Sequence, residues 1–151
     1  MVREVFWQGW GMANDSSLRT VSLSRDGDGV FTASNVRGGT VSIGSADSDF
    51  TPVELLLAAI GACTAIDVGT VTARRAEPES FQLRVDAQKV RDEQGNRLTD
   101  LSVTFAVSFP DGAAGDAARA LLPKIVAQSH DRLCTVGRTV ELGTPIATHL
   151  E

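Results

Sequence analysis

Two cysteines are the residues of this sequence with the most distinctive chemistry. Cys63 lies in the segment TPVELLLAAIGACTAIDV, residues 51–68, and Cys134 lies in LCTVGRTVELGTPI, residues 133–146. Thiolates are nucleophiles, and two thiols can interconvert with a disulfide. The sequence shows no export signal, so we expect a cytoplasmic location, where a disulfide between these residues is better explained by catalysis than by structure.

Each cysteine also has a structural interpretation. Cys63 sits in the longest apolar run of the chain, and free cysteine is among the most frequently buried residue types. Asp67 complicates this view, because a carboxylate one turn along the same helical face needs solvent or a partner. Cys134 follows His130 and lies near Arg132 and Arg138. Positive neighbours favour a thiolate there, but Cys134 could equally cap a helix end.

A helix is predicted to carry Cys63. Thr51, Pro52 and Glu54 form a Thr-x-x-Glu capping box with proline at the first helical position. The helix should run to about 74–75, before Pro78. It is apolar nearly all round, which is typical of a core or interface helix, and Gly61 predicts a close packing contact.

The elements around this helix predict an α+β protein. Residues 80–90 and 100–109 alternate apolar and polar side chains, as in a hairpin, and a second amphipathic helix should run from Ala114 to His130 or Leu133, kinked or split by Pro123. Residues 139–150 could add a last strand. Turn-forming Asn, Asp and Gly separate four early strand candidates and indicate an antiparallel meander. Those candidates are residues 3–12, 18–24, 29–34 and 39–45. We expect one domain over residues 1–151, with an antiparallel sheet and helices on one face.

Composition excludes two classes of partner. Fourteen basic and 19 acidic side chains give a net charge of −5 without a basic cluster, so nucleic-acid binding is not expected. The apolar run Leu55–Ile66 has about half the length of a membrane span, so no membrane association is expected.

The two cysteine segments together resemble the OsmC/Ohr family of osmotically induced and organic-hydroperoxide-resistance proteins. TPVELLLAAIGACTAIDV is similar to the family's Pro-x-Glu-Leu-Leu-x-Ala-Ala-x-x-x-Cys helix, and LCTVGRTVELGTPI is similar to its second-cysteine segment. The resemblance implies an intertwined homodimer, in which a curved antiparallel sheet packs on two long central helices and the active site lies at the dimer interface.

The resemblance also implies a function. Cys63 would attack an organic hydroperoxide and become a sulfenic acid, and Cys134 would resolve it as a disulfide. A dithiol, often a lipoyl group on a protein, would recycle the enzyme without a metal or organic cofactor. Family enzymes activate the thiolate with an arginine oriented by a glutamate, for which Arg37, or second Arg19, and Glu54 are the candidates here.

This sequence departs from the peroxidases at one position. Val53 follows the helix-starting proline where those enzymes have their glutamate, and Glu54 comes one residue later. A straight helix places Glu54 roughly opposite Cys63. The departure indicates a divergent OsmC-like branch, so a thiol redox sensor or a small-ligand-binding member of the fold is the main alternative.

Two further alternatives rest on residue content alone. The set His130, Cys134, Cys63 and His149 could bind a metal, although the close ligand pairs of structural zinc sites are lacking. A hydrolase with a cysteine, a histidine and an acid would need an oxyanion hole, for which the sequence gives no support.

Overall fold

The structure is a computed structural model that describes residues 17–45, 47 and 50–151. The chain divides into two compact units, Met1–Phe50 and Thr51–Glu151. The strand expected over residues 3–12 lies outside the described residues. The single-domain organisation expected from the sequence stays a prediction.

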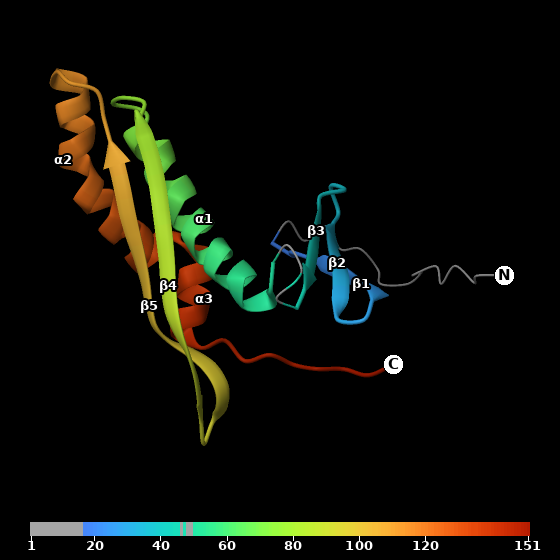
Figure 1. The fold of residues 1–151 in the computed structure, drawn as a ribbon. Coiled ribbons are helices and arrows are strands. Elements are labelled where there is room, and N and C mark those ends of the chain that lie inside the picture. Colours follow the sequence, from blue (N-terminus) through green and yellow to red (C-terminus); the bar gives the residue numbers. More distant parts are fainter. Residues whose placement is uncertain (1–16, 46, 48–49) are drawn as a thin grey trace. The chain divides into compact units, whose positions relative to one another are not determined.

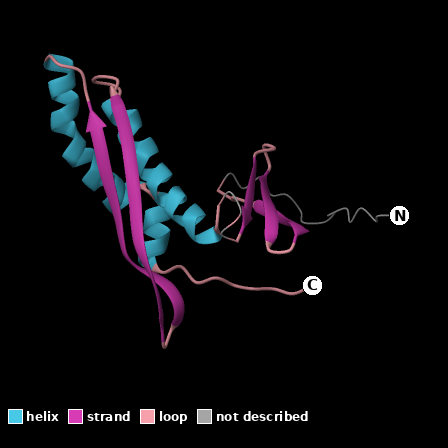
Figure 2. Ribbon diagram, viewed as in Figure 1, coloured by secondary structure: helices cyan, strands magenta, loops and turns pink. Residues whose placement is uncertain are grey.

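The first unit contains a three-stranded antiparallel sheet. Strands β1 (Val21–Gly27), β2 (Val30–Asn35) and β3 (Thr40–Gly44) pair in the order β1-β2-β3 (Figures 1 and 2). Gly29, with φ +68°, and Gly38, with φ +84°, occupy the two connecting turns, where glycine adopts the left-handed region at little cost. The predicted meander is confirmed for these three strands.

Helix α1 (Pro52–Thr72) opens the second unit and begins as predicted. The Thr51 hydroxyl accepts a hydrogen bond from the Glu54 backbone N–H at 3.3 Å, and the Glu54 carboxylate accepts one from the Thr51 N–H at 2.8 Å. These reciprocal bonds form the capping box. The helix ends at Thr72, slightly before the expected boundary.

The surface of α1 is unusually apolar. By length and composition alone, its 21 residues are enough to span a membrane. The sequence had predicted no membrane span, because the apolar run Leu55–Ile66 is shorter than the helix. Of its most apolar 18-residue stretch, 28% is buried within this chain. Exposed apolar side chains of α1 include Val53, Leu56 and Ile66. Such a helix needs cover from outside its own unit or from a membrane.

A long hairpin follows α1. Strands β4 (Ser80–Asp92) and β5 (Gly95–Ser108) pair antiparallel, with a register shift between Asp86 and Gln88. The close packing predicted at Gly61 is confirmed, because a Cβ atom there would lie 2.8 Å from Cγ2 of Val85 on β4. The missing side chain therefore lets α1 approach the hairpin closely.

The C-terminal part is helical. Helix α2 (Ala113–Gln128) passes through Pro123 without splitting and continues into a π-helical turn, η1 (Ser129–Leu133), and helix α3 (Thr135–Leu142) follows. The last strand predicted over residues 139–150 is therefore wrong. Its β-branched residues favoured a strand, but the Cys134 cap and Gly143 in the left-handed conformation set helical boundaries around 135–142.

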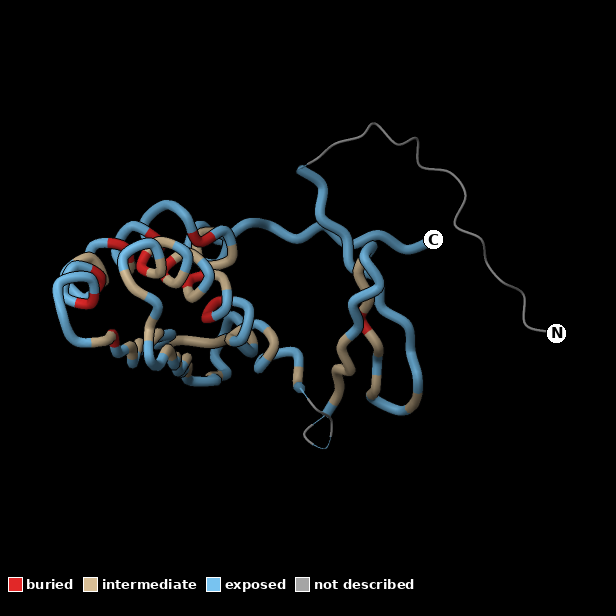
Figure 3. The backbone as a smooth tube through the Cα atoms, turned by 90° about the horizontal axis from the view of Figure 1, so that it is seen from above, coloured by how far each residue is buried: buried red, intermediate tan, exposed pale blue. Residues whose placement is uncertain are grey.

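The buried residues of the described chain gather mainly in the second unit. Figure 3 marks the buried positions in red. The largest fully buried side chains are those of Val68 and Thr72 on α1, Ser129 on η1 and Cys134 at the N-cap of α3. Ala33 on β2 is the buried hydrophobic residue of the first unit. The chain is thus a mixed α+β protein, as predicted, and Cys134 is one of the residues buried in its second unit.

Candidate active site around the two thiols

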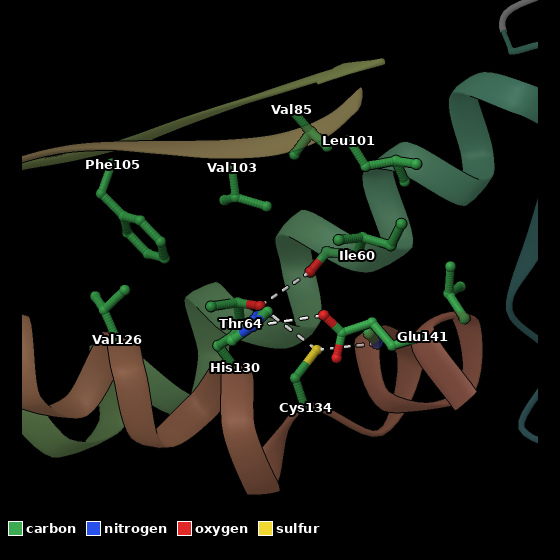
Figure 4. Close-up of a pocket in the computed structure, with 12 residues that line it drawn as sticks. Ile60, Thr64, Val85, Leu101, Val103, Phe105, Val126, His130, Cys134 and Glu141 are labelled. Carbon is green, nitrogen blue, oxygen red and sulfur yellow. Dashed lines mark hydrogen bonds and ion pairs between the residues drawn. The ribbon is translucent and has the colours of Figure 1, made fainter. Parts of the chain in front are cut away.

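A cavity of about 320 Å³ lies inside the second unit, between the hairpin and the helices. Figure 4 shows β4 and β5 on one side of it and α1, α2 and α3 on the other. Apolar side chains form the strand side of the wall, namely Val85, Leu101, Val103 and Phe105. Polar and ionisable groups reach it from the helices, namely Thr64, His130, Cys134 and Glu141. The site therefore combines an apolar space with one thiol and a few polar groups.

Cys134 forms the N-cap of α3. Its side chain is 2% exposed, and its Sγ accepts hydrogen bonds from the Gly137 backbone N–H at 3.3 Å and the Thr64 hydroxyl at 3.4 Å. The π-helical turn fixes its backbone, because the Cys134 N–H donates to the Ser129 carbonyl at 2.9 Å. A sulfur at a helix N-terminus faces the positive end of the helix dipole. This position favours negative charge on Cys134.

Cys63 projects from α1 toward the same helix end and is half-buried. Burial raises the pKa of the Cys63 thiol above its ordinary value, whereas hydrogen bonding to the backbone of Val136 and Thr135 lowers it. The Cys134 side chain raises it further, through a hydrogen bond and through charge. Both thiols are reduced. The structure therefore brings the two predicted cysteines into direct interaction at the start of α3.

In the part of the chain that the structure describes, no cationic side chain stabilises the thiolate of Cys63. Within residues 17–45, 47 and 50–151, no arginine or lysine lowers the pKa of the Cys63 thiol, and backbone groups are the stabilising influence. A thiol with a raised pKa is mostly protonated at neutral pH and therefore a poor nucleophile. A reactive Cys63 would need a further cation.

Glu141 contacts two of the basic side chains near Cys134. Its carboxylate lies 3.4 Å from Nε2 of His130 and 2.8 Å from Nη1 of Arg138. Of the basic neighbours that the sequence offered to Cys134, His130 and Arg138 therefore contact a carboxylate. The hydrogen bonds to Cys134 come instead from Thr64 and Gly137.

Asp67 has the partner that its place beside the core required. The Ser129 hydroxyl donates to Oδ2 of Asp67 at 2.8 Å, and Ser129 is completely buried. This bond joins α1 to the π-helical turn that precedes Cys134. It helps hold the two cysteine-bearing segments together.

Glu54 lies in the first turn of α1, before the part of the helix that makes these contacts. Its carboxylate Oε2 accepts hydrogen bonds from the backbone N–H and the hydroxyl of Thr51. The backbone bond, followed by the hydroxyl bond, lowers the pKa of Glu54 below its ordinary value. The capping role of Glu54 is confirmed, and its catalytic role stays a prediction.

The two arginine candidates belong to the first unit. Arg37 lies in the turn after β2, where its backbone N–H donates to Oδ1 of Asn35 at 2.9 Å. Arg19 precedes β1, and its Nη1 donates to the Leu18 carbonyl at 3.0 Å. Their role toward Cys63 stays a prediction.

Sequence reasoning missed three residues that form hydrogen bonds within the site. Thr64 and Gly137 bond to the sulfur of Cys134, and Ser129 bonds to Asp67. Thr64 directly follows Cys63, and Gly137 follows Cys134 by the spacing of a side-chain N-cap bond. Cysteine is not among the usual N-cap residues, so this spacing gave no clear signal of a helix start at Cys134. Ser129 had no signal either, because its partner Asp67 is distant in the sequence.

The described part of the chain gives no support to the metal alternative. No group of three or more His, Cys, Asp or Glu side chains there could hold a metal ion. The fold brings two thiols together, and one of them, Cys134, lines a mainly apolar cavity.

Comparison with known proteins places this arrangement in a family. A sequence model described as OsmC-like protein matches residues 44–149. An uncharacterized protein of Mycobacterium tuberculosis is 30% identical over 126 residues, which cover 82% of this chain and 90% of that protein. The chain belongs to the OsmC-like protein family.

Solved structures share the fold. An OsmC-like protein of unknown function from Vibrio cholerae matches with a TM-score of 0.68 and 16% identity, over 83% of this chain and 94% of that one. A Legionella pneumophila protein described as an organic hydroperoxide resistance protein OsmC matches with a TM-score of 0.53 and 16% identity, over 82% and 90%. At these identities the likeness concerns the fold.

Proposed function

We propose that this protein is a thiol-dependent peroxidase that reduces organic hydroperoxides. The observation that carries the proposal is the meeting of two reduced thiols at the start of α3, where Cys134 also lines a mainly apolar cavity. An apolar cavity suits the organic part of a hydroperoxide. The description of the Legionella relative as an organic hydroperoxide resistance protein supports the same activity.

The proposed cycle has three steps. The Cys63 thiolate attacks the terminal peroxide oxygen, the O–O bond breaks, and the alkoxide takes a proton to leave as an alcohol. Cys134 then attacks the Cys63 sulfenic acid, forming the disulfide and releasing water. A dithiol, such as a lipoyl group on a protein, reduces the disulfide by thiol exchange in the cytoplasm. The cycle uses no metal or organic cofactor.

The cation for Cys63 comes, in this proposal, from Arg37, with Arg19 as the second candidate. A guanidinium beside the thiol would counter the pKa rise caused by burial. Among the described contacts, the Thr51 bonds of Glu54 use Oε2. In this proposal Glu54 is the carboxylate that orients the arginine.

A homodimer completes the proposed enzyme. Ile66 on α1 is 68% exposed, and Val53 and Leu56 are also exposed, so α1 presents an apolar surface that a second copy can cover. We propose the intertwined dimer with a curved sheet that the family resemblance implies. Light scattering at micromolar concentration should give the mass of two chains, and a stable monomer would contradict this arrangement.

Turnover tests the proposed activity. Purified protein should consume cumene hydroperoxide when supplied with dithiothreitol or dihydrolipoamide, and Cys63→Ser should abolish consumption. An absence of turnover with both dithiols would favour a redox sensor or a ligand-binding protein. Those proteins would keep the thiol pair without a catalytic cycle.

A further inference from the structure

Thr64 contacts the sulfur of Cys134 from a buried position on α1. Its side-chain oxygen lies 3.4 Å from Sγ of Cys134 and 3.3 Å from the carbonyl oxygen of Ile60. Figure 4 shows the hydroxyl between these two groups. Thr64 is 7% exposed, so water does not compete freely for these bonds.

A hydroxyl group has one hydrogen to donate, whereas the two neighbours of Thr64 can both accept it. When Cys134 is a neutral thiol, the hydroxyl can donate to the Ile60 carbonyl and accept the S–H. When Cys134 is a thiolate, rotation about the C–O bond turns the same hydrogen toward sulfur. Thr64 can therefore serve both protonation states without moving its carbon atoms.

We propose that Thr64 is a catalytic residue of the resolving step, in which its hydroxyl stabilises the Cys134 thiolate that attacks the Cys63 sulfenic acid. The role in resolution rests on the proposed peroxidase function, whereas thiolate stabilisation does not. During the step the S–S bond forms, the S–O bond of the sulfenic acid breaks, and the proton lost by Cys134 leaves with the hydroxyl group as water. Thr64 supplies a hydrogen bond and no net proton.

The surroundings of Cys134 make this contribution important. The strands contribute apolar side chains to the cavity wall, and the ionisable groups that face it from η1 and α3, besides Cys134, are His130 and Glu141, which contact each other. From α1, Cys63 also interacts with Cys134. The direct hydrogen bonds to Sγ come from the hydroxyl of Thr64 and the backbone N–H of Gly137. Mutation can remove the first of these without altering the backbone.

Thiolate absorbance at 240 nm tests the proposal without any peroxide. In a Cys63→Ala background Cys134 is the only cysteine, so a pH titration reports on it alone. Adding Thr64→Val keeps the branched shape but removes the hydroxyl, and should move the midpoint upward by about one pH unit, since a hydrogen bond to a charged group stabilises it substantially. Adding Thr64→Ser, the matched control, should leave the midpoint within a few tenths of a unit.

The outcomes separate the two proposals. Equal midpoints for the Val and Ser variants would overturn the role of Thr64, even if the protein is an active peroxidase. With Cys63 present, Thr64→Val should lengthen the lifetime of the Cys63 sulfenic acid about tenfold, measured by dimedone trapping after one equivalent of cumene hydroperoxide. If Thr64→Val fails to fold, Thr64→Ala against Thr64→Ser makes the same comparison. Wild-type protein that forms no sulfenic acid would contradict the peroxidase function and leave the titration result standing.

Discussion

The first backbone N–H groups of α1 and of α3 have no partner within their own helix, and different side chains cap the two helices. At α1, Thr51 and Glu54 satisfy the free N–H groups through bonds that span three residues, at an exposed position. At α3, the cap is the sulfur of buried Cys134, which also accepts a hydrogen bond from Thr64 on another helix. The first cap is local and the second is tied to tertiary structure.

This difference indicates what each cap can do besides ending a helix. A threonine–glutamate box at the surface stabilises α1 and leaves the carboxylate near solvent. A thiol at the positive end of α3 is held beside a second thiol and can change its charge. A mutation that keeps the capping bond but removes the carboxylate charge at α1, or the thiol at α3, therefore shows whether that group has a role besides capping.

The largest expected effect comes from the thiols themselves. Cys63→Ser should abolish hydroperoxide consumption, because a serine hydroxyl does not attack the O–O bond at neutral pH. Cys134→Ser should keep α3 intact, since serine is a good N-cap, while steady-state turnover is lost and the Cys63 sulfenic acid accumulates. Peroxide assays, dimedone labelling and thermal melts measure the three effects. Full turnover by Cys134→Ser would show that Cys134 only caps the helix.

Arg37→Met should have the next largest effect. Without the cation, burial leaves the pKa of Cys63 raised, so the reaction at pH 7 should slow by about 100-fold and recover as the pH rises. Rates of Cys63 oxidation across the pH range measure this change, with Arg19→Met as the matched control. If Arg19→Met slows the oxidation of Cys63 more than Arg37→Met does, Arg19 is the cation for Cys63.

Glu54→Gln should have a smaller effect on rate. Glutamine preserves the capping box but cannot orient a guanidinium by charge, so turnover should fall by about tenfold at pH 7. Because hydrogen bonds lower the pKa of Glu54 in the folded chain, its charge stabilises the fold above the ordinary carboxyl value of 4.5 and this contribution is lost as the pH falls. The free energy of unfolding should therefore fall less between pH 7 and pH 3 for Glu54→Gln than for the wild type, as measured by denaturation at each pH. Unchanged turnover would leave Glu54 as a cap alone.

Thr51→Ala should affect stability and not rate. Loss of the cap should lower the free energy of unfolding by about 1 kcal/mol, measured by urea denaturation, with turnover by the folded protein within about twofold of the wild type. A large loss of turnover would mean that the start of α1 is part of the catalytic machinery.

Local signals in the sequence predicted the elements well and their contacts less well. The capping box fixed the start of α1, Gly61 predicted its close approach to β4, and alternation predicted the hairpin. Residues 139–150 failed because helix α3 depends on a cap by Cys134, and a cysteine is not a usual capping signal. The Asp67–Ser129 and Thr64–Cys134 contacts join residues distant in the sequence, so they emerge only when α1 packs against η1 and α3.

Disulfide formation in a single turnover tests the central claim most directly. Reduced protein treated with one equivalent of cumene hydroperoxide, then alkylated and digested, should give the peptides of Cys63 and Cys134 joined by a disulfide, with the loss of two hydrogen atoms in the intact mass. Recovery of both cysteines in alkylated form, after the hydroperoxide has been given time to react, would contradict the account.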